Sequence, residues 1–332
     1  MTTSRALAAF LLALSACAPA PAPSAFPAVD EALRPGAHRA RLNGVELWYR
    51  VAGNDDGNAP PVVFLHGGPG QGSAHFEALA GPVLEPRLRM VYLDQRGSGR
   101  SERPASGAYS LDLLVDDVEA LRRHLGVPRL ALVGHSFGGA LALEYAARYP
   151  DHVSGVVIAS GLWDTRLQCR HRLRTVARLA PAAYARVAAD TLAPDGSRRN
   201  DCELEFQAFA DDAERDAFNT AAMFPDPSVE ARIDSVEAAR GTRNTGELGG
   251  ALFSQGLLEY RFTAFDRVRA PVLVIAGGHD GAVHPDGLRP LAERLPVARF
   301  VAYESAGHFL YLDEPGRFAR DVASFLAAAG RR

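Results

Sequence analysis

The chain of 332 residues has no lysine, so all 36 of its basic residues are arginine, as the codon usage of a GC-rich genome would produce. It has no excess of positive charge either: the formal net charge is -3 and the isoelectric point is about 6.4. Proteins that bind nucleic acid need basic surfaces to contact phosphates. The composition therefore excludes nucleic acid as a partner. Hydrophobic residues make up 47% and charged residues 23%, the balance of a globular protein with a large core.

No apolar run at the N-terminus is long enough to cross a bilayer, which needs about 20 residues. Arg5 is followed by the short apolar run Ala6 to Leu14, the order found in secretory signal peptides. We predict that residues 1–16 are a signal peptide.

The run ends in Leu14-Ser15-Ala16-Cys17, which resembles a bacterial lipoprotein signal. That resemblance implies that Cys17 is lipidated and becomes the first residue of the mature chain, anchored in the bacterial cell envelope. The Pro- and Ala-rich residues 17–35 would then form an extended tether. An ordinary cleavage site among the small residues that surround Cys17 is the alternative.

Cysteine is scarce, with three in the whole chain. If Cys17 carries lipid, Cys169 and Cys202 remain, and an even pair in an exported protein predicts a disulfide. Two separate buried thiols are the alternative.

Short apolar runs alternate with helical patterns through most of the chain, which predicts an α/β fold with a mostly parallel, doubly wound sheet. Asn43-Gly44 predicts a hairpin turn that opens the domain. The expected strands are 39–42, 45–51, 61–65, 90–93, 130–133, 153–159, 272–276 and 299–302. The expected helices between and after them include 111–125, 138–148, 286–295 and 315–328.

About a hundred residues interrupt this alternation. Residues 162–266 favour helix and contain no clear buried strand, so we expect a helical cap inserted into the sheet domain. The core is then residues 36–161 together with 267–332.

The sequence Gly134-His135-Ser136-Phe137-Gly138 stands between an expected strand and an expected helix. GxSxG in this context predicts a nucleophile elbow, a tight turn that exposes a serine oxygen at the carboxyl edge of the sheet. The amide of Phe137 would then be one donor to an oxyanion. A glycine-rich turn with a capping serine is the alternative.

A second oxyanion donor is expected after the third strand, where His66-Gly67-Gly68-Pro69-Gly70 follows. Glycine leaves the backbone open to a carbonyl oxygen, and we select the amide of Gly68. We expect His66 to brace this loop and to take no part in the chemistry.

A serine hydroxyl is a poor nucleophile unless an imidazole, held by a carboxylate, takes its proton. Asp280 follows the strand 272–276 and His308 follows the last strand, so both belong at the same sheet edge as Ser136. The order Ser136, Asp280, His308 is the order of this fold. His284 and Asp286 are the nearest substitutes, further along the chain.

The motifs HGGPG at 66–70, DQRGSGRS at 94–101 and GHSFGG at 134–139 together resemble the proline iminopeptidase family of α/β-hydrolases. We interpret the second motif as a polar turn with an Asp94 to Arg96 pair near the site. The resemblance implies release of N-terminal residues from peptides, with the free amine bound by carboxylates of the cap.

Two features depart from that family: Phe137 stands where its members usually carry Trp, and their Trp-Glu cap motif has no counterpart between 162 and 266. A carboxylesterase or lactonase with the same triad therefore stays an alternative, as does a ligand-binding relative that turns over slowly. Acids of the cap are expected to lie mostly on solvated helix faces: Asp201, Glu203, Glu205, Glu214, Glu230 and Glu247.

The residues that several other enzyme classes require are missing from the sequence. Epoxide hydrolases and haloalkane dehalogenases need a carboxylate where Ser136 stands. We find no sequence motif for a metal or a cofactor, and GK[ST] is missing after the glycine-rich loop. The expected partner is a small peptide, ester or amide substrate.

Overall fold

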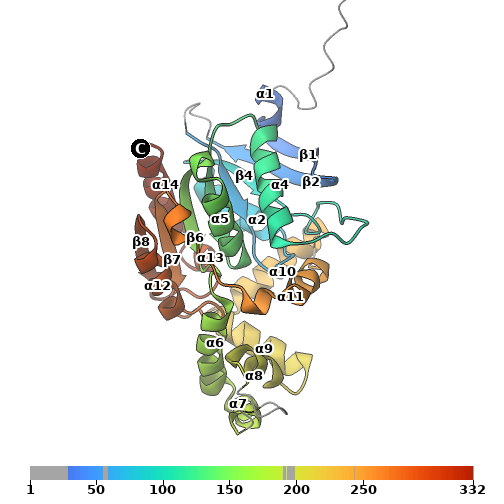
Figure 1. Cartoon of the computed structure of the whole chain (residues 1–332), viewed down its shortest axis with the longest axis vertical. Helices are drawn as coiled ribbons and strands as arrows, with labels where there is room; N and C mark the ends of the chain where they lie inside the picture. Colours follow the sequence, from blue (N-terminus) through green and yellow to red (C-terminus); the bar gives the residue numbers. More distant parts are fainter. Residues whose placement is uncertain (1–28, 55–58, 190–191, 193–198, 243, 332) are drawn as a thin grey trace, which may run out of the picture.

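The computed structural model describes residues 29–54, 59–189, 192, 199–242 and 244–331 (Figure 1). The predicted signal peptide and Cys17 lie outside these residues. No helix among the described residues is long and apolar enough to span a membrane.

One sheet of eight strands forms the centre of the molecule, in the order β1-β2-β4-β3-β5-β6-β7-β8. Strand β2 is antiparallel to β1 and β4, and all other neighbours are parallel, as predicted. The turn between β1 and β2 has positive φ at Asn43 (45°) and Gly44 (82°), the geometry expected of an Asn-Gly hairpin. The strands are β1 Gly36–Leu42, β2 Val45–Gly53, β3 Val62–Leu65, β4 Arg89–Leu93, β5 Leu130–His135, β6 Val153–Ala159, β7 Val272–Gly277 and β8 Ala298–Tyr303.

Helices cover both faces of the sheet because the central strands are apolar on both sides. In β3, Val63 and Leu65 belong to one hydrophobic cluster, while Val62 and Phe64 belong to the other. The first cluster includes side chains of α4 Leu111–His124, α5 Phe137–Arg148 and α12 Pro285–Arg294. The second includes side chains of α2 Ala74–Leu79, α3 Gly81–Leu84, α13 Leu310–Asp313 and α14 Pro315–Ala329.

Helices fill the chain between β6 and β7, and several of them extend away from the sheet (Figure 1). A third hydrophobic cluster lies within them and includes Val176, Leu204 and Phe218. We call residues 162–266 the cap. Its elements are α6 Thr165–Leu179, α7 Pro181–Ala188, α8 Asp201–Gln207, α9 Asp212–Met223, α10 Ser228–Arg240, α11 Glu247–Ser254, η2 Leu257–Glu259 and η3 Phe265–Arg267, which ends just beyond it.

Cys169 on α6 and Cys202 on α8 are joined by a disulfide, so the two-thiol alternative does not hold. Helix α7 lies between the two bonded helices in the chain. The bond therefore closes a loop that contains a large part of the cap.

The expected tether is not extended throughout. Helix α1 Val29–Ala32 lies inside residues 17–35, where we expected no regular structure. Ala32 is buried, and its carbonyl accepts a hydrogen bond from the hydroxyl of Tyr49 at 3.0 Å. Packing against β2 thus orders a short segment whose composition alone gave no signal.

Candidate active site

Ser136 lies on a sharp turn between β5 and α5, with φ 54° and ψ -123°. The turn brings strand and helix so close that side chains are excluded beside it. A Cβ on Gly134 would lie 2.3 Å from the carbonyl oxygen of Gly138, and a Cβ on Gly138 would lie 2.0 Å from that of Leu65. Both glycines of the motif are therefore required by backbone contact.

His308 and Asp280 form a buried hydrogen-bonded pair. His308 Nδ1 lies 2.8 Å from Asp280 Oδ2, and the two residues are 4% and 1% exposed. The other carboxylate oxygen, Oδ1, accepts the amides of Ala282 and Val283, each at 2.8 Å. A carboxylate held in this way accepts a hydrogen bond from Nδ1–H of the neutral imidazole. Because the ring proton is then on Nδ1, Nε2 carries a lone pair and can act as a base.

The loop after β3 packs directly against the nucleophile. Strand β3 pairs with β5, and a Cβ on Gly67 would lie 2.8 Å from Cβ of Ser136. Gly68 follows with φ 111°. Phe137 is the first residue of α5, where an amide has no acceptor within the helix. The loop that carries Gly68 and the first residue of α5 thus both lie next to Ser136 in the fold, and the oxyanion roles of the Gly68 and Phe137 amides stay predictions.

His66 braces this loop as expected. The amide of Gln95 donates to Nε2 of His66 at 3.0 Å, so the proton of the neutral ring is on Nδ1, which lies 3.0 Å from the carbonyl of Gly67. Burial lowers the pKa of His66 to about 4, which keeps the ring neutral.

The predicted pair of Asp94 with Arg96 is wrong. Asp94 instead accepts from Arg100 Nε at 2.7 Å and from the hydroxyl of Ser73 at 2.6 Å. Arg96 forms a bidentate pair with Asp117 of α4, with both contacts at 2.6 Å. The glycines between Asp94 and Arg100 fold the chain back, so that the more distant arginine reaches the carboxylate.

The end of cap helix α9 holds the loops of both the acid and the base. The carbonyl of Ala222 accepts the amide of Gly281 at 2.7 Å, and the carbonyl of Met223 accepts the amide of His308 at 2.9 Å. Carbonyls in the last turn of a helix lack partners within it. Here they position the residue next to Asp280 and the base itself. The sequence carries no signal for this contact, because only backbone atoms make it.

The cap also touches the oxyanion loop. Asn244 donates from Nδ2 to the carbonyl of Pro69 at 2.9 Å. A Cβ on Gly70 would lie 2.5 Å from Asn244 Oδ1, so glycine is needed there to admit the amide. The contact with Asn244 of the cap is therefore one reason why the loop after β3 needs glycine.

A buried row of polar side chains links the elbow to cap helix α10. His135 Nε2 lies 3.1 Å from the carbonyl of His308, and its Nδ1 lies 3.5 Å from the hydroxyl of Tyr311. That hydroxyl lies 3.1 Å from His75 Nε2, and His75 Nδ1 lies 3.2 Å from Glu237 Oε1. Sequence reasoning missed Glu237. Its helix also carries Glu230 and Asp234, so nothing in the pattern distinguishes Glu237 from them.

The six cap acids considered from the sequence bind other groups of the cap or its border. Arginines pair with four of them, including Glu247 with Arg103 of the core, and polar side chains contact the other two. The contacts are Asp201 with Arg170, Glu203 with Asn200, Glu205 with Arg172, Glu214 with Arg186, Glu230 with Thr220 and Glu247 with Tyr109.

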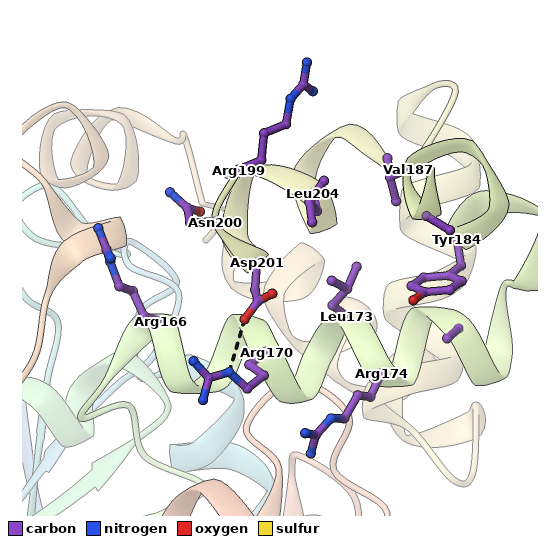
Figure 2. A pocket seen from close by; sticks show the side chains of 12 residues that line it. Arg166, Arg170, Leu173, Arg174, Tyr184, Val187, Arg199, Asn200, Asp201 and Leu204 are labelled. Atoms are coloured by element: carbon purple, nitrogen blue, oxygen red, sulfur yellow. Dashed lines mark hydrogen bonds and ion pairs between the residues drawn. The ribbon is translucent and has the colours of Figure 1, made fainter. Parts of the chain in front are cut away.

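A cavity of about 600 Å³ lies between α6, α7 and α8 (Figure 2). No triad residue lines it. Four arginines and one carboxylate do: Arg166, Arg170, Arg174, Arg199 and Asp201. An excess of positive charge repels an ammonium group, so this cavity is unsuited to the free amine of a peptide.

The sequence pattern of the α/β-hydrolase fold matches residues 60–315, more than half of the chain. The chain belongs to the α/β-hydrolase-fold family. This α/β-hydrolase is 26% identical to the proline iminopeptidase of Lactiplantibacillus plantarum, over 86% of the chain and 99% of the relative. It is 30% identical to the 2-hydroxymuconate semialdehyde hydrolase of Pseudomonas putida, over 85% of the chain and 92% of the relative.

Among solved structures, the proline iminopeptidase-related protein of Thermus thermophilus superimposes on this α/β-hydrolase with a TM-score of 0.71. The two chains are 27% identical, and the match covers 90% of this chain and 99% of the other. Relatives with different named activities thus share the fold and most of the length.

Proposed function

We propose that this α/β-hydrolase is a serine hydrolase with Ser136 as nucleophile, His308 as general base and Asp280 as the residue that orients the base. The observation that carries the proposal is the buried 2.8 Å contact of His308 Nδ1 with Asp280 Oδ2, on loops that share a sheet edge with the strained serine turn. The chain order Ser136, Asp280, His308 and the contact of His308 with Asp280 support a Ser-His-Asp triad.

The first half-reaction acylates the serine. Nε2 of His308 takes the proton of Ser136 Oγ as that oxygen attacks the substrate carbonyl, and the amides of Gly68 and Phe137 stabilise the oxyanion. His308 then protonates the leaving amine. In the second half-reaction His308 takes a proton from water, the hydroxide attacks the acyl carbon, and Ser136 recovers its proton as the acid leaves.

For the substrate, we propose a peptide with a free N-terminal amine, from which the first residue is released. The named proline iminopeptidases among the relatives support this class. Within the chain, the support is Glu237, a cap carboxylate whose side chain is 17% exposed and which is joined to the elbow by the buried polar row. Such a group can bind an ammonium ion without full desolvation.

The substrate panel that tests this class compares prolyl- and alanyl-arylamides with their N-acetyl forms and with p-nitrophenyl esters. Loss of the ammonium partner from a largely buried carboxylate costs several kcal/mol. We therefore expect kcat/KM for free-amine arylamides to be at least about a hundredfold higher than for the acetylated forms. Equal rates, or rapid ester cleavage without arylamide activity, would reject the aminopeptidase and favour the carboxylesterase or lactonase.

The variant Glu237→Gln tests whether Glu237 binds the free amine of the substrate. We expect this variant to lose about tenfold or more of the free-amine preference, because the neutral amide no longer attracts the ammonium group. Glu230→Gln on the same helix is the matched control and should keep the preference. A Glu237→Gln variant with the full preference would remove Glu237 from the proposal.

We also propose that the protein is anchored in the bacterial cell envelope by lipid on Cys17. Mass spectrometry of the mature chain should find an acylated Cys17 as its first residue. A mature chain that begins beyond Cys17 would contradict the anchor.

A further inference from the structure

Three side chains with metal-ligating atoms meet outside the triad, where the cap joins the core. They are His171 on α6, His284 just before α12, and Asp286 in the first turn of α12. One ligand atom of each lies within 4.8 Å of the others. The two imidazole rings are stacked, with centroids 5.0 Å apart and planes at 4°. His284 Nδ1 lies 3.7 Å from Asp286 Oδ2.

No sequence pattern indicates this cluster. His171 and His284 are separated by 113 positions (284 − 171), far outside the spacing of known metal motifs. By sequence, His284 and Asp286 are only the nearest substitutes for His308 and Asp280. The structure excludes them from that role, because the pair with His308 is made by Asp280.

Other contacts of α6 hold the backbone on both sides of the cluster. Gln168 Oε1 accepts the amide of His284 at 3.1 Å. Thr175 packs on the same loop, where a Cβ on Gly281 would lie 2.8 Å from its Cγ2. Gln168, His171 and Thr175 follow at spacings of three and four, so they share one face of the helix. The contacts of Gln168 and Thr175 with this loop thus hold the two imidazole rings next to each other.

Two imidazole nitrogens and one carboxylate oxygen form a donor set of intermediate softness. Zn²⁺ and its neighbours among the transition metals favour such ligands, whereas Mg²⁺ and Ca²⁺ favour oxygen alone. The side chains of His284 and Asp286 are 33% and 70% exposed, so an ion can reach them from solvent.

We propose that His171, His284 and Asp286 bind a divalent transition-metal ion of the zinc class, with water in the remaining position. The ion links the first cap helix to the loop that carries Asp280, since His284 follows that residue by four positions. It binds the folded chain and strengthens the attachment of the cap to the core. Small rotations of the stacked rings bring the nitrogens to bonding distance.

The test is a zinc titration of the full chain after treatment with EDTA, followed by calorimetry and by thermal unfolding. We expect one ion per chain and a rise of the melting temperature of about 3 °C at saturation. His171→Gln and His284→Gln should lose both effects. His279→Gln removes an exposed imidazole of the same loop outside the cluster and should keep them.

Two further measurements guard against a variant that fails to fold. Asp286→Asn alters a largely exposed side chain and should weaken zinc binding while the variant stays folded. Zinc X-ray absorption of the wild-type chain should show two imidazole ligands and oxygen. Sulfur ligation, an equal response in wild-type and His171→Gln protein, or no zinc binding by the folded wild type would each overturn the proposal.

Discussion

The backbone of Ser136 occupies a region that residues other than glycine rarely adopt, at a cost of about 1–3 kcal/mol. The surroundings enforce it. Gly134 and Gly138 approach other backbone atoms so closely that no other residue fits, and the amide of Ser136 donates to the carbonyl of Ala159 at 3.2 Å. The sharp turn that carries Ser136 is therefore a consequence of how α5 packs on β3 and β5.

Gly138→Ala tests this packing. Its Cβ would lie 2.0 Å from the carbonyl oxygen of Leu65. Because this oxygen is a backbone atom, no change of side-chain rotamer can relieve the clash. We expect a loss of about 3 kcal/mol or more in the free energy of unfolding, measured in urea. Gly250→Ala in α11 is the control: a Cβ there meets nothing within 4 Å, so stability should stay or rise by up to about 1 kcal/mol. Equal effects of the two substitutions would contradict the close-packing explanation.

The placement of Ser136, Asp280 and His308 at one edge of the sheet was predictable from the sequence, because each residue follows an apolar strand and parallel strands end at one edge of the sheet. The supports of the triad were not. The carbonyls of Ala222 and Met223 hold the loops of Asp280 and His308 through backbone atoms, which are the same in every sequence.

At the scale of elements, Glu119 connects α4 to its neighbours. Its carboxylate accepts from Arg122 and Arg123 of its own helix, from the hydroxyl of Tyr145 on α5 at 3.0 Å, and lies 3.1 Å from His152 Nδ1 on η1 Pro150–His152. Burial alone would raise the pKa of Glu119, but the hydrogen bonds from Arg122, Tyr145 and Arg123 outweigh it and lower the pKa to about 2.

This pKa predicts acid sensitivity. In the unfolded chain the pKa of a glutamate is about 4.3. The contribution of ionised Glu119 to the free energy of unfolding is therefore complete above that pH and is lost as the pH falls toward 2. We expect the stability difference between wild type and Glu119→Gln to shrink by about 2 kcal/mol between pH 6 and pH 3. Urea unfolding of both proteins at the two pH values measures it. A difference independent of pH would show that Glu119 is not ionised in the way described.

The strands were predictable because unbroken runs such as Leu130 to Val133 leave no polar face. Their ends lie within two residues of the predicted ones, except that β1 begins three residues earlier, at Gly36. The short helices α2, α3 and α13 were not predicted. They are four to six residues long, too short for a repeating apolar pattern, and tertiary packing of side chains such as Phe76 and Leu84 determines them.

At the scale of the whole molecule, the cap combines a small hydrophobic cluster with one covalent link. The cluster has eight buried members, far fewer than the clusters on the two faces of the sheet. The disulfide closes a loop with a sequence separation of 33. A small core of this kind needs such a link more than the sheet domain does.

Replacement of Cys169 and Cys202 by alanine should therefore destabilise the cap selectively. The chain-entropy relation gives about 3–4 kcal/mol for a loop of this length. We expect amide hydrogen exchange to accelerate in α6 to α9 and to stay unchanged in β5 and β6, since the cap has its own core. Uniform acceleration across both regions would show that cap and sheet unfold together.

The two cysteines could be paired from their number, but the contacts that attach the cap to the core could not be predicted. His171 with His284, Asn244 with Pro69 and Glu237 with His75 each join residues more than a hundred positions apart. Pattern reasoning detects periodicity within a segment, whereas these contacts depend on how separate segments pack.

The most direct test of the central claim is covalent labelling of the active serine with a fluorophosphonate, followed by peptide mapping. If His308 and Asp280 activate Ser136, the reagent should form one adduct, on the peptide that contains Ser136, and hydrolysis should stop in proportion to labelling. Ser136→Ala should take up no label and should lose activity by a factor on the order of 10⁶ while it stays folded. Full activity in the folded Ser136→Ala variant, or an adduct on another residue that abolishes activity, would contradict the account.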